Sequence, residues 1–232
     1  MCFSASASFV VATTLASVGA LSLVKARTKS LTMAAFTPIL LAIQQACEGL
    51  VWLRINSGDF TSTWFKIGVY GFQFFAGVVW PLWIPLTLYF IEHRTKNKKF
   101  LGLCTIIGSV ICIIILAALW QSPASVQVVD HHLRYPLFTT QLKFLLPSLA
   151  EWETNAICYL GLTLYTIVVV GSCFISTFPG VRILGILFAL GFIMSMLGYQ
   201  LAFASVWCFF AAISSITIYG IITYHNRQHS YK

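Results

Sequence analysis

Charged side chains are scarce in this sequence: only 9% of its 232 residues are Asp, Glu, Lys or Arg, whereas 59% are hydrophobic. Soluble domains carry about 25% charged residues, so this composition excludes a soluble globular protein. The apolar residues form long unbroken runs of the roughly 20 residues that a transmembrane helix needs, not the short alternating segments of a barrel. We therefore predict one all-α membrane domain over residues 1–232.

Several motifs that mark particular chemistry are also missing. The chain has no P-loop glycine pattern, no HExxH, no GxSxG and no arginine-rich span, and the last apolar run has no lysine for a retinal Schiff base. The seven cysteines include no CxxC pair, so most are expected to be small apolar fillers. The first residues lack a basic signal-peptide region, so the first span is expected to stay in the mature chain.

Hydropathy predicts a bundle of seven transmembrane helices and one long outer loop. The last two spans lie so close together that six spans with one broken element over 183–224 is the alternative. The predicted spans are 9–24, 33–53, 64–91, 100–120, 155–176, 183–199 and 202–224, and the outer loop is 121–154.

The basic residues predict the orientation of this bundle, because Lys and Arg accumulate in cytoplasmic loops. Ten of the 14 Lys and Arg residues fall in the connections on one side of the predicted spans, including the C-terminal tail. This pattern predicts an outer N-terminus and a cytoplasmic C-terminus in an inner or plasma membrane. It also explains the net charge of +8 by contact with anionic lipid, not nucleic acid.

The second predicted span contains an unusual group of polar residues. Gln44, Glu48 and Trp52 are four residues apart and share one helix face, while Gln45 is turned about 100° away. A carboxyl group inside a span is costly and generally marks a partner or a function. Glu48 is therefore expected either to bind a ligand, proton or metal, or to be hydrogen-bonded to another helix.

The predicted orientation brings polar groups of four spans to the same outer level as Glu48. We expect a polar pocket there that binds a small ligand, ion or cofactor. Glu151 has a second interpretation as a helix cap with Ser148. The expected ligand-binding residues are Gln44, Gln45, Glu48, Trp52, Gln73, Glu151, Glu153, Gln200 and Trp207, and Tyr199, Ser205 and Cys208 lie at the same level.

A metal ion is a further possible occupant of the outer side. The candidate ligands are Cys2, Cys158, Cys208, His131 and His132. The alternatives are a disulfide between cysteines, simple packing of the cysteines, and a solvated loop around the histidines. At over 30 residues, the outer loop is expected to be a lid or to contain an interfacial helix, which the sequence favours in its second half, 137–150.

Three sequence blocks carry a family resemblance: MCFSASASF at the start, QQACEGLVWL from Gln44, and SVWCFFAAISS from Ser205. Together they resemble an uncharacterised family of bacterial integral membrane proteins. The resemblance implies no activity. It does imply one signature, whose members here are Cys2, Ser4, Gln44, Gln45, Glu48, Trp52, Trp207 and Cys208.

Three other classes of function stay open beside a ligand-binding protein. A small transporter or channel would use Glu48 as a proton or cation site and a kink at Pro81 and Pro85 as its gate. A membrane enzyme would depend on a metal or on the thiol of Cys2 or Cys208. A sensor or assembly subunit would act through partner helices.

Overall fold

The computed structural model describes residues 4–129, 131–135, 148 and 150–230, and most of these are helical. Within these described residues, seven helical segments are long and apolar enough to cross a membrane, in agreement with the predicted count. Residues 183–224 hold parts of two of them, so the six-span alternative is wrong. The seven segments are Ala5–Lys25, Lys29–Asn56, Thr63–Ile91, Thr95–Gln121, Glu151–Ile175, Val181–Gly198 and Gln200–Gln228.

Three of these segments are divided into shorter elements. The third and fifth each contain a π-helical turn, and the seventh begins with a 3₁₀ turn and is interrupted after Ser214. The elements are α1 (Ala5–Lys25), α2 (Lys29–Asn56), α3 (Thr63–Phe74), η1 (Phe75–Val79), α4 (Trp80–Ile91), α5 (Thr95–Gln121), β1 (Gln127–Val129), β2 (His132–Arg134), α7 (Glu151–Thr166), η2 (Ile167–Gly171), α8 (Ser172–Ile175), α9 (Val181–Gly198), η3 (Gln200–Ala202), α10 (Phe203–Ser214) and α11 (Thr217–Ser230).

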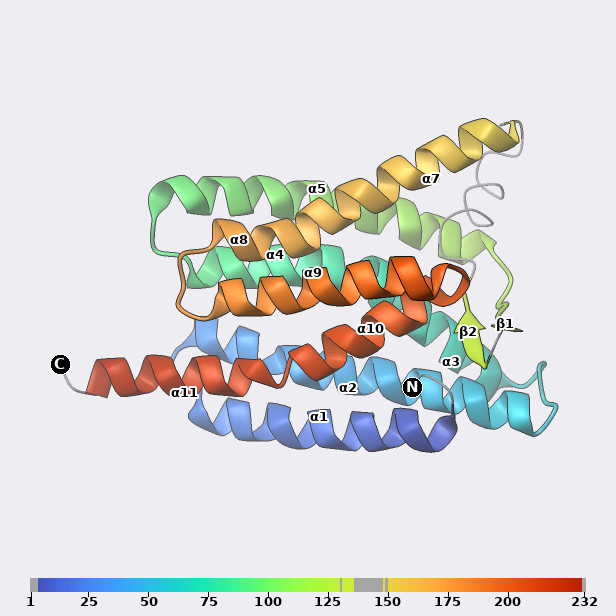
Figure 1. Cartoon of the computed structure of the whole chain (residues 1–232), viewed down its shortest axis with the longest axis horizontal. Helices are drawn as coiled ribbons and strands as arrows, with labels where there is room; N and C mark the ends of the chain where they lie inside the picture. The colour runs from blue at the N-terminus through green and yellow to red at the C-terminus, as the bar shows by residue number, and fades with distance from the viewer. Residues whose placement is uncertain (1–3, 130, 136–147, 149, 231–232) are drawn as a thin grey trace.

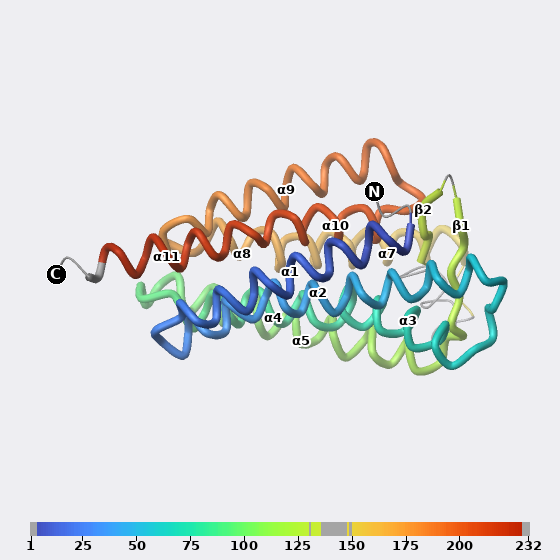
Figure 2. Tube along the Cα trace, turned by 90° about the horizontal axis from the view of Figure 1, so that it is seen from below, coloured from blue at the N-terminus to red at the C-terminus, as the bar shows by residue number. Residues whose placement is uncertain are grey.

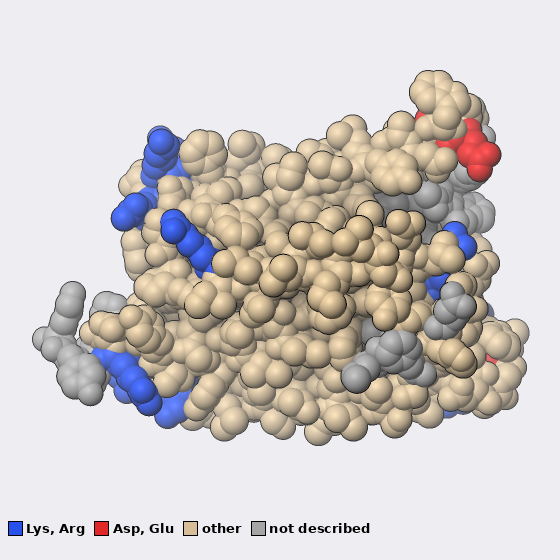
Figure 3. All heavy atoms as spheres, viewed as in Figure 1, with Lys and Arg blue, Asp and Glu red and all other residues tan. Residues whose placement is uncertain are grey.

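The helices lie side by side and give the molecule two distinct ends (Figures 1 and 2). We call the end that carries β1, β2 and the α2–α3 turn the hairpin end. The opposite end carries the α1–α2 and α4–α5 turns and the C-terminus. Lys and Arg atoms gather there on the face drawn in Figure 3, so we call it the basic end.

Short polar side chains start several of the helices. Ser4, Thr28 and Ser62 precede α1, α2 and α3, and each side-chain oxygen accepts a hydrogen bond from the backbone N–H three residues later. Such N-caps satisfy donors that the first helical turn leaves free. They allow turns of only a few residues between successive spans.

The third span is irregular next to Pro81, one of the two prolines at which the sequence predicts a kink. Its π-helical turn η1 comes directly before Pro81, and the backbone N–H of Trp80 bonds to the carbonyl of Phe75, five residues earlier. The chain then stays helical through Pro81 and Pro85. Helix α5 packs closely here, because a Cβ atom at Gly108 would overlap the carbonyl oxygen of Pro81.

The first half of the predicted outer loop contains a two-stranded antiparallel hairpin, which the sequence analysis did not predict. Strands β1 and β2 pair Gln127 with Arg134 and Val129 with His132. Leu133 is fully buried, and the Tyr135 ring stacks on the Phe72 ring with 4.1 Å between their centroids. The hairpin therefore packs against the helical bundle. The interfacial element predicted over 137–150 lies almost wholly outside the described residues.

Candidate functional site

The polar face predicted on α2 lies entirely inside the bundle. Gln44, Gln45 and Glu48 are all 0% exposed, and Trp52 is buried in the apolar cluster at the hairpin end. Buried polar groups are costly unless they are hydrogen-bonded. The partners of these side chains therefore indicate how the site is organised.

Helix α10 supplies partners for two of the polar side chains. Ser205 donates a hydrogen bond to the carboxyl group of Glu48, and the Nε2 of Gln44 donates to the sulfur of Cys208 at 3.1 Å. Residues 44 and 48 are one turn apart on α2, and residues 205 and 208 are about one turn apart on α10. The two helices are thus joined in one register by two side-chain bonds.

Helix α4 adds a third member to this arrangement. The indole Nε1 of Trp80 donates to the Oε1 of Gln44 at 2.8 Å, so the Gln44 amide serves both as acceptor and as donor. Trp80 is only 6% exposed. The amide of Gln44 is the central link between three helices, and we call Gln44, Glu48, Trp80, Ser205 and Cys208 the polar network.

Gln45 stands apart from this network. Both polar atoms of its amide are buried, and neither has a hydrogen-bond partner among the described residues. Buried amides without protein partners are commonly satisfied by an internal water. Gln45 also does not line the cavity described next.

A cavity of about 460 Å³ lies at the hairpin end, beside the polar network. Cys208 is the one member of the network on its surface, whereas Gln44, Glu48, Trp80 and Ser205 do not line it. The described residues that line the cavity are Ala76, Ser125, Gln127, Arg134, Tyr135, Asn155, Cys158, Tyr159, Leu162, Tyr165, Gln200, Leu201, Phe203, Ala204, Trp207 and Cys208.

The deep part of the cavity wall is fixed by hydrogen bonds within the protein. The hydroxyl of Tyr165 donates to the carbonyl of Ala76 in the π-helical turn η1 at 2.6 Å, and the indole of Trp207 donates to the carbonyl of Phe188 at 3.2 Å. Local π-helical turns are frequent at functional sites because they redirect backbone groups. Here the turn presents Ala76 to Tyr165 and so joins the third and fifth spans.

The predicted residues at the start of α7 lie away from the polar network. Glu151 is exposed, Glu153 is partly buried, and neither lines the cavity. The capping box predicted with Ser148 is wrong, because α7 begins at Glu151 and the carboxylate of Glu153 accepts the backbone N–H of Ala150 at 2.9 Å. Ala150 has no polar side chain, so only this half of a capping box exists.

The remaining predicted ligand-binding residues are divided between the cavity and the core. Gln200 and Trp207 line the cavity, whereas Gln73 is 2% exposed on α3 and does not line it. Sequence reasoning missed Arg134 and Tyr165 as lining residues. Arg134 lies in the predicted outer loop, where a basic residue suggests no ligand by itself, and nothing in the sequence marks Tyr165.

The candidate metal ligands do not form a cluster in the described part of the chain. No group of three or more His, Cys, Asp or Glu side chains there is arranged to hold a metal ion. His131 is exposed with φ of 60°, while His132 is buried with its ring edge-on to Tyr199 at 4.7 Å. Cys158 and Cys208 both line the cavity, and Cys2 lies outside the described residues.

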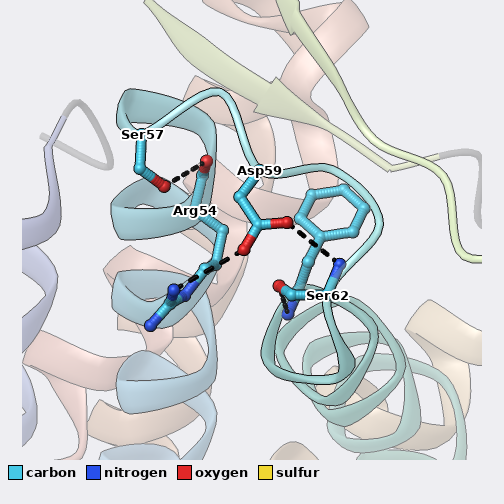
Figure 4. Close-up of polar contacts among 5 residues, drawn as sticks. Arg54, Ser57, Asp59 and Ser62 are labelled. Carbon is cyan, nitrogen blue, oxygen red and sulfur yellow. Dashed lines mark hydrogen bonds and ion pairs between the residues drawn. The ribbon is translucent and has the colours of Figure 1, made fainter.

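Two charged residues at the hairpin end, Arg54 and Asp59, are engaged in the α2–α3 turn (Figure 4). Arg54 pairs with Asp59 at 3.6 Å, and the carboxylate of Asp59 accepts the backbone N–H of Ser62 at 3.1 Å. Hydrogen bonding by the Ser62 side chain is the main cause that lowers the pKa of Asp59, with a smaller contribution from Arg54. These groups stabilise the turn.

At the basic end, a buried carboxylate that sequence reasoning did not single out joins two turns. Glu92 accepts the backbone N–H groups of His93, Arg94 and Thr177 and the hydroxyl of Thr177, at 2.6 to 3.0 Å. Burial opposes its ionisation, but these bonds outweigh burial and lower the pKa of Glu92 from 4.5 to about 2. Glu92 thus fastens the α4–α5 turn to the α8–α9 turn.

Comparison with known proteins places this bundle in a family. The family described as "Family of unknown function (DUF6629)" matches residues 1–231. The chain belongs to this family. The match covers almost the whole of this DUF6629 member, in agreement with the resemblance to an uncharacterised family. No curated protein and no solved structure matches the chain.

Proposed function

We propose that this DUF6629 member is a multi-pass protein of the cell membrane that binds a small organic molecule in the cavity at its hairpin end. The hairpin end faces the outside and the basic end the cytoplasm. Ten of the 14 Lys and Arg residues fall on the basic side of the spans, as expected for cytoplasmic loops. The seven apolar helices support the membrane assignment.

The observation that carries the proposal is the size and lining of the cavity. Its volume of about 460 Å³ is in the range of small-molecule sites, which are mainly apolar and aromatic with a few polar groups. Tyr159, Tyr165, Phe203 and Trp207 supply aromatic surface from two different spans. A bound molecule would thus be held between the fifth and the seventh spans.

The polar network has a supporting role in this proposal. Gln44 and Glu48 on α2 form hydrogen bonds with Cys208 and Ser205 on α10. These bonds fix the orientation in which α10 presents Cys208 and Trp207 to the cavity. This differs from the sequence expectation, in which Gln44 and Glu48 themselves contact the ligand. The costly buried carboxyl group then serves to position the cavity wall.

A cavity-filling substitution tests the proposal. Ala204 lines the cavity, so Ala204→Phe is expected to occupy the space of a bound molecule, whereas Ala156→Phe on the exposed face of α7 is the matched control. Native mass spectrometry of gently extracted protein should show a bound small molecule in the wild type and in Ala156→Phe, and its loss in Ala204→Phe. Identical spectra for all three proteins would overturn the proposal.

Transport is a second candidate function, supported by a row of cavities along the bundle. The cavity at the hairpin end is followed by narrow cavities of about 30 and 40 Å³ and by one of about 400 Å³ at the basic end. Neighbouring cavities share lining residues: Tyr165, Trp207 and Cys208 for the first pair, Thr37 and Ile84 for the second, and Ile91 and Phe178 for the third.

The narrow cavities predict where such a route is closed. Ala211 lines the 30 Å³ cavity, so Ala211→Phe should block movement without filling the wide cavity. Proton flux into proteoliposomes, driven by a potassium diffusion potential, should then be lost in Ala211→Phe and retained in Ala156→Phe. Wild-type flux equal to that of empty liposomes would remove proton transport as a function.

A further inference from the structure

The cavity changes in polarity along its length. Its outer rim is formed by polar side chains of the hairpin segment, of α7 and of the α9–α10 turn: Ser125, Gln127, Arg134, Asn155 and Gln200. At 1.5 Å per residue, Cys208 lies about 7.5 Å along α10 from Phe203, and Tyr165 lies about 15 Å along α7 from the rim residue Asn155. The deep part is therefore lined mainly by Ala76, Leu162, Tyr165, Trp207 and Cys208.

The polar atoms in the deep part already have partners inside the protein. The Tyr165 hydroxyl and the Trp207 indole both donate to backbone carbonyls, and the Cys208 sulfur accepts from Gln44. These groups gain little from a polar ligand, because their hydrogen bonds would have to be exchanged. The deep part is thus suited to an apolar chain.

The rim carries one charged group that is available for a ligand. Among the described residues that line the cavity, Arg134 alone has a charged side chain. It is exposed, and in the described part of the chain no hydrogen bond or ion pair engages its guanidinium. By contrast, Arg54 at the same end is paired with Asp59.

Among the described residues, no carboxyl group lines the cavity beside Arg134. Glu153 caps α7, Glu151 is exposed, and neither lines the cavity. Glu48 lies behind Ser205 in the core. The rim therefore favours an anionic group, and a guanidinium binds carboxylate or phosphate oxygens with two parallel hydrogen bonds.

Two hydrophobic residues at the edge of the cavity are exposed on the side of the bundle, where lipid would surround the helices. Helix α7 diverges from α9 toward the hairpin end (Figure 1). Tyr159 on α7 and Leu201 on the opposite edge both line the cavity, yet they are 69% and 54% exposed. The edge of the cavity between α7 and η3 thus carries two exposed hydrophobic side chains.

We propose that the ligand is a membrane amphiphile with an anionic head group and an apolar chain, which reaches the cavity sideways between α7 and η3. Arg134 binds the head group at the rim, and the chain lies along Leu162, Phe203 and Trp207. The proposal rests on the proposed function, because it names the class of molecule that the same cavity takes.

The test compares three probes with the same twelve-carbon chain: dodecyl phosphate, dodecanol and dodecylamine. Saturable binding is measured with protein in phosphatidylcholine nanodiscs, after subtraction of binding to empty nanodiscs. Dodecyl phosphate should bind most tightly, and Arg134→Gln should weaken it by roughly 10-fold to 100-fold, as for loss of charged hydrogen bonds. Arg54→Gln is the matched control and should retain wild-type affinity.

The outcomes separate the ligand class from the site itself. If Ala204→Phe abolishes binding of every probe but Arg134→Gln changes none, the cavity binds ligands and the anionic class is wrong. If Ala204→Phe leaves saturable dodecyl phosphate binding intact, the cavity is not the site and the proposed function fails as well. Equal weakening by Arg134→Gln and Arg54→Gln would indicate general surface charge and overturn the role of Arg134.

Discussion

The hydrogen bond between Trp80 and Gln44 offers the sharpest test of the polar network. The Gln44→Leu substitution leaves the buried Trp80 indole N–H without its acceptor at 2.8 Å and removes the donor to Cys208. Leaving a buried donor unsatisfied costs about 1–3 kcal/mol. Trp80→Phe leaves the Gln44 carbonyl unsatisfied and also removes ring volume, so we expect a loss of about 2–4 kcal/mol.

A double-mutant cycle isolates the bond from these other losses. Gln44→Leu and Trp80→Phe together remove both partners, so the double variant should be more stable than the sum of the single losses implies. Hydrogen bonds between membrane helices average about 0.6 kcal/mol and reach about 1.7 kcal/mol in such cycles. This bond is fully buried, and we expect its coupling energy in the upper half of that range.

The assay is reversible unfolding in mixed micelles of dodecyl maltoside and sodium dodecyl sulfate, followed by circular dichroism. The control cycle uses Trp83 and Thr37, which form the same kind of indole bond at 3.0 Å between the same two helices at a partly buried site. Its coupling energy should be smaller. A Trp80–Gln44 coupling below about 0.3 kcal/mol, the level of simple additivity, would refute the structural role given to Gln44.

Two further predictions concern close packing and pH. Gly108→Ala should destabilise the bundle by about 1–3 kcal/mol, because the new methyl group overlaps the Pro81 carbonyl, whereas Gly161→Ala in open space should stabilise it by about 0.5–1 kcal/mol. The opposite ranking in the micelle assay would contradict this packing. The lowered pKa of Glu92 contributes stability above pH 4.5 that is lost as the pH falls toward 2, by no more than about 3 kcal/mol before screening by solvent. Glu92→Gln should be less stable at pH 7 and should lack this acid-dependent loss, and an unchanged pH profile would show that the carboxylate does not hold the two turns.

The helices could be predicted because the hydrophobicity of each span is visible in its own continuous stretch of sequence. Long apolar runs separated by short polar turns determine the seven helices, and α2 and α10 contain their polar residues at helical spacing. The hairpin was missed because β1 and β2 are only three residues each. Their formation depends on burial of Leu133 and Tyr135 against the bundle, a contact between distant parts of the chain that local propensity does not record.

The candidate site could be predicted only in part, for a related reason. Topology predicts which residues share a level, but it does not predict which of them face one another. Glu151 and Gln73 lie on helices that reach the hairpin end, yet neither lines the cavity, whereas Tyr165 does. The difference depends on helix rotation and on the divergence of α7, which follow from packing and leave no periodic signal in the sequence.

The position of Cys208 relates the buried network to the cavity. Its sulfur accepts a hydrogen bond from Gln44, and Cys208 itself lines the cavity. A substitution at Gln44 can therefore alter the cavity wall through Cys208 alone. Helix α10 places Trp207 next to it, and that ring contacts Phe203 and Tyr165 at 5.4 and 5.7 Å between centroids. Loss of the Gln44 bond should therefore loosen an aromatic wall as well as the core. On this argument Gln44→Leu weakens amphiphile binding without any direct contact with the ligand, whereas Arg134→Gln weakens binding without loss of stability, and the two variants separate the supporting network from the binding surface.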